Sequence, residues 1–182
     1  AARHYNNSLQ DNYKHVLIEG DFFYAKAFSY VAPLKDNNIV KLLANSVAEI
    51  AEAESCSFSK SDSIDSVLKS YYEKLNKRAA LYSVAGELGG YLNKTDGKLI
   101  DLMKEFGKYI GMAYLIRLEM RDFLTREKEV CFSDSKLNLL KIFDDFGETD
   151  VLRKAKEEIE KMCGMAQKAL SGFSQNYSRE NE

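Results

Sequence analysis

The chain has 182 residues, 45% of them hydrophobic and 30% charged, and this length and composition predict one domain with a sizeable core. Because 26 Lys and Arg face 28 Asp and Glu, the formal net charge is −2, and without a basic block the chain is not expected to bind nucleic acid. Its apolar runs are far shorter than the ~20 residues that span a bilayer, and three separated cysteines without a CxxC pair argue against a disulfide framework, so we expect a cytoplasmic protein that is not an integral membrane protein.

One proline and 10 glycines predict a mostly helical chain, because an all-β protein of this length needs turn residues more often. The first helix is predicted over Asp11 to Val31 and ends before Pro33. A second helix follows an N-cap at Asp36 or Asn37. The polar segment ESCSFSKSDS behind it predicts a loop.

The next apolar pattern begins after a cap at Asp62 or Ser63 and continues to Leu92, a length that fits two helices or one kinked helix. Its second half, AALYSVAGELGG, is rich in alanine and glycine. Because each glycine costs a helix about 1 kcal/mol relative to alanine, we interpret this segment as a surface that another helix approaches closely.

Three further apolar patterns predict helices with recognisable ends. They run from a cap at Thr95 or Asp96 to about Leu124, from Lys136 to Phe146 before Gly147, and from a cap at Thr149 or Asp150 to Phe173. Together the patterns predict an all-α bundle of six or seven helices.

The chain lacks the common signatures of catalysis. Neither of its two histidines belongs to an ExxH pair, and GxSxG, P-loop, GxGxxG and HExxH motifs do not occur. The remaining pattern is Glu119 and Asp122, whose i, i+3 spacing on a predicted helix lets two carboxylates face one Mg²⁺. Since Arg117 and Arg121 lie within neutralising reach, the same pattern also fits a solvated helix face.

Four segments carry charged and small residues in a fixed order. They are VLIEGDFFYAKAF with Gly20 and Asp21, AEIAEAE ending at Glu54, YYEKLNKRAALYSVAGELGGYL with Lys77 and Arg78, and FGKYIGMAYLIRLEMRDFL with Glu119 and Asp122. In order and spacing they resemble the trans-isoprenyl diphosphate synthase (polyprenyl synthetase) family over about residues 14–124. Lys77 stands at the lysine of the family's Lys-Thr-Ala stretch with Arg78 at its threonine, and the last segment is similar to the family's GxAFQxxDDxxD helix.

The resemblance implies the orthogonal helical bundle of the isoprenoid synthase type, built around a central apolar cavity. In that family, Mg²⁺ held by two aspartate-rich motifs grips an allylic prenyl diphosphate, whose cation is then attacked by isopentenyl diphosphate. Cations are needed because the departing diphosphate carries concentrated negative charge. By resemblance, Lys77 is the candidate for binding diphosphate, and Glu119 and Asp122 are the candidate metal ligands.

The sequence departs from this pattern at both aspartate-rich motifs. Leu115 stands at the family's glutamine, Leu118 at its first aspartate, and Arg121 adds a positive charge that would repel Mg²⁺. The first motif would precede residue 1, so we expect residues 1–182 to form a single isoprenyl-synthase-like domain without the N-terminal part that carries it. Losing most of two metal sites should abolish turnover, and no catalytic residue is predicted.

The sequence leaves three functions open. The first is a polyprenyl synthetase-like protein of isoprenoid metabolism that is a non-catalytic or accessory subunit, paired as a homodimer or as a heterodimer with a competent synthase. The second is a divergent but active prenyltransferase of the geranylgeranyl or polyprenyl diphosphate synthase type, which would use Mg²⁺ and an allylic prenyl diphosphate. The third is a helical interaction module without isoprenoid chemistry or cofactor, in which Lys77, Glu119 and Asp122 are surface charges.

Overall fold

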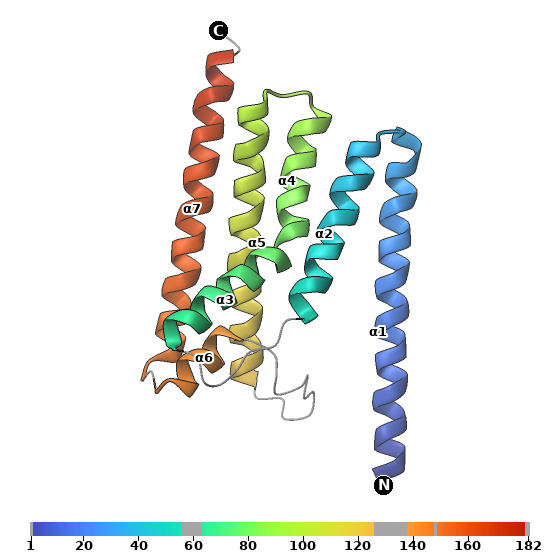
Figure 1. Cartoon of the computed structure of the whole chain (residues 1–182), viewed down its shortest axis with the longest axis vertical. Helices are drawn as coiled ribbons and strands as arrows, with labels where there is room; N and C mark the ends of the chain where they lie inside the picture. Colours follow the sequence, from blue (N-terminus) through green and yellow to red (C-terminus); the bar gives the residue numbers. More distant parts are fainter. Residues whose placement is uncertain (1, 56–62, 126–137, 148, 181–182) are drawn as a thin grey trace. The chain divides into compact units, whose positions relative to one another are not determined.

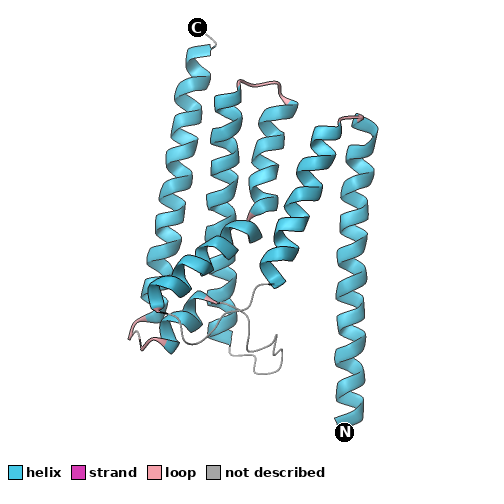
Figure 2. Cartoon of the chain, viewed as in Figure 1, coloured by secondary structure: helices cyan, strands magenta, loops and turns pink. Residues whose placement is uncertain are grey.

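The computed structural model describes residues 2–55, 63–125, 138–147 and 149–180, and every regular element within these ranges is a helix (Figure 2). In chain order the elements are α1 (Ala2–Val31), the short 3-10 helix η1 (Ala32–Leu34), α2 (Asn37–Ser55), α3 (Ile64–Arg78), α4 (Ala80–Leu92), α5 (Gly97–Thr125), α6 (Leu139–Asp145) and α7 (Val151–Glu180) (Figure 1). The chain forms two compact units, Ala1–Leu42 and Leu43–Glu182, whose boundary lies inside α2.

The first unit contains α1, η1 and the start of α2. Helix α1 ends at Val31 as predicted, because Pro33 follows within η1 and cannot donate a backbone hydrogen bond. Lys35 then takes a left-handed φ of 51°. The Asp36 carboxylate accepts a hydrogen bond from the backbone N–H of Asn38 at 2.9 Å, which selects Asp36 from the two predicted caps.

Side-chain caps also explain where four helices of the second unit begin, α3, α5, α6 and α7. The cap residues are Ser63, which accepts from the Ser66 amide at 3.4 Å; Asp96, which accepts from Lys98 at 3.0 Å; Asn138, which accepts from Leu140 at 2.9 Å; and Asp150, which accepts from Arg153 at 3.3 Å. Three of these four were among the predicted alternatives. For α6 the predicted start at Lys136 lies outside the described residues, while its stop is confirmed by Gly147, which has a φ of 74°.

The long pattern that ends at Leu92 is two helices rather than one. Helix α3 ends and α4 begins at Ala79, which is fully buried. The Ala79 amide still donates to the Leu75 carbonyl at 3.0 Å, so the chain changes direction without leaving this backbone group unpaired.

Close packing of α4 on α5 depends on glycine. A Cβ on Gly86 would collide with the carbonyl oxygen of Met103, and a Cβ on Gly90 would lie 3.0 Å from the Ile100 side chain. The predicted helix contact is therefore confirmed at these two positions. Gly89, in contrast, has no neighbouring heavy atom within 4 Å of the corresponding point.

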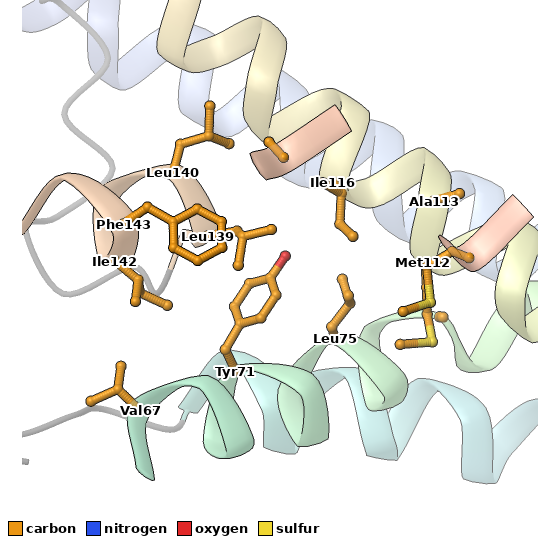
Figure 3. Close-up of a cluster of buried hydrophobic side chains, with 13 residues drawn as sticks. Val67, Tyr71, Leu75, Met112, Ala113, Ile116, Leu139, Leu140, Ile142 and Phe143 are labelled. Atoms are coloured by element: carbon orange, nitrogen blue, oxygen red, sulfur yellow. The ribbon is translucent and has the colours of Figure 1, made fainter. Parts of the chain in front are cut away.

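The core of the second unit joins α3, α5, α6 and α7. Figure 3 shows ten of its side chains labelled, with the Tyr71 ring from α3 between residues of α5 and α6. The buried members are Val67, Tyr71, Leu75, Ala79, Met112, Ala113, Ile116, Leu139, Leu140, Ile142, Phe143, Ala155 and Met162. Burial of each large side chain contributes about 1.5–3 kcal/mol to stability. Helix α5 lies between α4 and α7, and both of these helices pack along it (Figure 1).

From its composition the chain is expected to have no disulfide framework and no membrane-spanning helix. Cys163 is a free, partly buried thiol, as predicted, whereas Cys56 and Cys131 lie outside the described residues. Within the part of the chain that the structure describes, none of the helices has both the length and the apolar character that a bilayer crossing demands.

Candidate functional site

Glu119 is a charged residue inside the core. It lies on α5, three residues after the fully buried Ile116, and the helical period places both on one face. The residue is only 6% exposed. Because an ionised carboxylate is costly to bury without partners, its surroundings must supply hydrogen-bond donors.

Three donors from two other helices supply this need. Glu119 Oε1 accepts a hydrogen bond from Arg78, at the end of α3, with a distance of 2.7 Å to its guanidinium nitrogen. Oε2 accepts from the Tyr71 hydroxyl at 2.9 Å and from the backbone N–H of Leu139, the first residue of α6, at 3.1 Å. Glu119 therefore ties α3, α5 and α6 together. Figure 3 shows the Tyr71 hydroxyl pointing from α3 toward Ile116 and Leu139.

Burial and hydrogen bonding oppose each other at this carboxylate. Burial raises the pKa of Glu119 above its ordinary value, while the Leu139 amide, Arg78 and the Tyr71 hydroxyl all act to lower it. The pKa of Tyr71 is raised well above its ordinary value, first by burial and then by the adjacent Glu119 charge. Tyr71 thus stays protonated and remains a donor to the carboxylate.

Arg78 extends the network toward α2. Its Nε lies 3.1 Å from a carboxylate oxygen of Glu54, so one guanidinium pairs with two carboxylates from different helices. Lys74, whose side chain is 6% exposed, lies 3.9 Å from Glu54. A separate pair joins Lys77 to Glu52 at 3.0 Å.

The structure brings only one of the three predicted site residues into the core. Glu119 is buried, whereas the Asp122 side chain is 66% exposed and forms an ion pair with Arg121 at 3.1 Å. The Lys77 side chain is 42% exposed. Glu119 and Asp122 differ by a net rotation of only about 60° around the helix axis. Their exposures of 6% and 66% show that the edge of the buried face passes between them.

The residues present do not fit a magnesium ion as the structure arranges them. Mg²⁺ demands near-octahedral oxygen ligands at about 2.0–2.1 Å, whereas both oxygens of Glu119 already accept hydrogen bonds from protein groups. Among the described residues no group of three or more His, Cys, Asp or Glu side chains is suited to hold a metal ion. The metal role of Glu119 and Asp122 and the diphosphate role of Lys77 stay predictions.

Sequence reasoning missed the partner that matters most to Glu119. It pointed to the neighbours Arg117 and Arg121, but Arg117 is exposed and Arg121 pairs with Asp122. The arginine in contact is Arg78, 41 residues earlier in the chain. A signal was present, because Arg78 replaces the threonine of the resembled pattern in a chain whose metal-binding segment is altered as well.

Comparisons with known proteins agree with the resemblance read from the sequence. A family model described as polyprenyl synthetase matches residues 6–131. A prenyl transferase of Synechocystis is 34% identical over 118 residues, which are 64% of this chain and 36% of that protein. Component 2 of a heptaprenyl diphosphate synthase from Bacillus subtilis is 23% identical over 115 residues, covering 63% of this chain and 33% of that protein.

A solved structure has the same fold. The crystal structure of a geranyltranstransferase from Methanosarcina mazei superposes with a TM-score of 0.66 at 20% identity, covering 86% of this chain and 53% of that one. The likeness shows the all-α isoprenoid synthase fold, and the chain spans about a third of the length of the curated relatives named above. From the family model and the shared fold together, the chain belongs to the polyprenyl synthetase family, a prenyltransferase-like family of isoprenoid synthases.

Proposed function

We propose that this chain is a non-catalytic or accessory subunit of a prenyl diphosphate synthase. The observation that carries the proposal is the environment of Glu119, which by resemblance belongs to the metal-binding segment of the family. Its carboxylate is committed to Arg78, Tyr71 and the Leu139 amide. A departing diphosphate needs concentrated positive charge beside it, and the partners of this carboxylate compete with a metal ion for its oxygens.

A partner chain completes the proposed function. The Bacillus subtilis relative is named as component 2 of a synthase, so by its name it is one component of that enzyme. A relative from Geobacillus stearothermophilus carries the same name and is also 23% identical. We propose a comparable arrangement for this chain, with a catalytically competent synthase as its heterodimer partner, while a homodimer is the outcome to exclude by measuring the mass of the assembly.

Lys77 is the residue proposed to contact diphosphate. Its ammonium group is partly exposed on α3, next to Arg78 and one helical turn after Lys74, so a soluble anion can reach it. Calorimetric titration with geranylgeranyl diphosphate tests this role: Lys77→Gln should weaken binding several-fold, whereas Lys69→Gln, at an exposed lysine of the same helix, should not. Equal affinities for the two variants would contradict the assignment.

The test of the main proposal is turnover. The purified chain should incorporate no labelled isopentenyl diphosphate into an allylic prenyl diphosphate in the presence of Mg²⁺, under conditions in which a competent family member serves as the positive control. Robust turnover by the chain alone would contradict the non-catalytic assignment. Addition of the chain to a competent partner should change that partner's rate or product length.

The names of several relatives favour an active prenyltransferase as the second candidate. One relative, from Saccharolobus solfataricus, is named geranylgeranyl diphosphate synthase and is 25% identical over 122 residues. This candidate predicts turnover that depends on Mg²⁺ and falls sharply in both Glu119→Ala and Asp122→Ala. Turnover that survives in one of these variants would remove the substituted residue as a metal ligand.

A further inference from the structure

The guanidinium of Arg78 lies between two carboxylates. It approaches Glu119 at 2.7 Å and Glu54 at 3.1 Å, using a different nitrogen for each. The Arg78 side chain is 23% exposed and Glu119 is 6% exposed, so the inner contact is shielded from solvent. This geometry suits arginine, because a planar fork can address two acceptors at once whereas a lysine ammonium is a single point charge.

Two cationic side chains contact the carboxylates of this cluster. Glu54 and Glu119 contribute two negative charges, and Arg78 and Lys74 contribute two positive charges within the same set of contacts. Removing one partner of a buried pair is strongly unfavourable, because the remaining charge stays desolvated without compensation. Arg78 is therefore the cation that compensates the buried charge of Glu119.

We infer that Arg78 is the resident cation of the Glu54–Glu119 pair, and that its loss would open a site at which a small external cation binds. In the native chain the guanidinium fills the position between the two carboxylates, so this part of the core is complete without a divalent ion. Once Arg78 is shortened, the carboxylates of Glu54 and Glu119 lose the guanidinium that contacts both of them. The cations that can take its place are methylguanidinium and hard divalent ions, which carboxylates bind through oxygen.

The inference is tested by thermal unfolding of the full chain with and without added cations. Wild type should unfold at the same temperature in EDTA and in millimolar MgCl₂. Arg78→Ala should unfold on the order of 10 °C lower, and millimolar methylguanidinium chloride or MgCl₂ should restore part of that loss. The double variant Arg78→Ala/Glu119→Gln should show no such recovery.

Arg121→Ala is the matched control, because Arg121 also pairs with a carboxylate of α5 but is 66% exposed. It should unfold close to the wild-type temperature and respond to neither cation. Stabilisation of wild type by MgCl₂ that Glu119→Gln abolishes would overturn the inference. Failure of both cations to raise the unfolding temperature of folded Arg78→Ala would overturn it as well.

A second measurement decides the matter if Arg78→Ala does not fold. Manganese binding to wild type and to Glu119→Gln can be followed by electron paramagnetic resonance of free Mn²⁺. Equal binding to the two proteins supports Arg78 as the resident cation, and Mn²⁺ binding that is lost in Glu119→Gln refutes it. The inference rests on the same premise as the proposed function, that Arg78 occupies the Glu119 carboxylate. The turnover assay distinguishes the two, because it measures catalysis and not cation binding at the cluster.

Discussion

The two halves of α5 are held by different forces. Over residues 97–111 the helix approaches α4 so closely that Gly107 faces the Tyr82 carbonyl and Gly111 faces the Tyr82 side chain. Over residues 112–122 the same helix packs on α3 and α6 through large apolar side chains and the buried Glu119. Packing of the first half depends on the close approach of two helices at glycines, and packing of the second half depends on hydrogen bonds to the buried Glu119.

This contrast determines which changes each half tolerates. In the first half an added methyl group at Gly107 is harmful, because the backbone carbonyl of Tyr82 occupies the space and cannot rotate away. In the second half a lost group is harmful, because its partners stay buried without a hydrogen bond. Substitutions at matched positions can separate the two effects.

The largest effect is expected at Glu119. Glu119→Ala leaves Arg78, the Tyr71 hydroxyl and the Leu139 amide without their shared acceptor, and should lower the free energy of unfolding by about 3–5 kcal/mol. Asp122→Ala, one turn later at an exposed position, should change it little. Chemical denaturation of both variants measures the difference, and equal effects would show that burial of the charge is not what distinguishes the second half.

A smaller effect is expected in α4, where the substitution adds a methyl group and does not remove a side chain. Gly86→Ala forces a Cβ against the Met103 carbonyl oxygen and should destabilise the protein by about 1–3 kcal/mol. Gly89→Ala meets no neighbour and should stabilise it by up to about 1 kcal/mol, because alanine is the better helix former. The same denaturation experiment reports both signs. Stabilisation by both substitutions would mean that α4 and α5 are not in close contact at Gly86.

The sequence predicted the first half of this contrast better than the second. Helix ends and the glycine-rich contact depend on residues close together in the chain, so the sequence narrowed two caps to pairs that include Asp36 and Ser63, and it placed Gly86 in a predicted contact segment. The environment of Glu119 depends on Arg78 and on the Leu139 amide, 41 and 20 residues away. Periodicity placed Glu119 and Asp122 on one helix, but it could not show where the buried face of that helix ends.

The smallest effect compares tyrosines from the two regions at high pH. Burial and the nearby Glu119 raise the pKa of Tyr71 well above 10, whereas burial and Tyr114 raise that of the more exposed Tyr82. Since unfolded tyrosine loses its proton near pH 10 and folded Tyr71 does not, the unfolded state binds fewer protons above this pH. The stability that Tyr71 contributes is therefore present below pH 10 and is lost as the pH rises through its folded pKa.

Unfolding free energies of wild type and Tyr71→Phe at several alkaline pH values test this linkage. The advantage of wild type over the variant should shrink by up to about 1.4 kcal/mol per pH unit above 10. Tyr82→Phe is the matched control from the close-packed region, where a smaller change is expected because the ring is partly in water. The contrary result is a stability difference between wild type and Tyr71→Phe that stays constant with pH, while the difference for Tyr82→Phe changes. That result would place the desolvated hydroxyl beside the glycine contact and not beside the buried carboxylate.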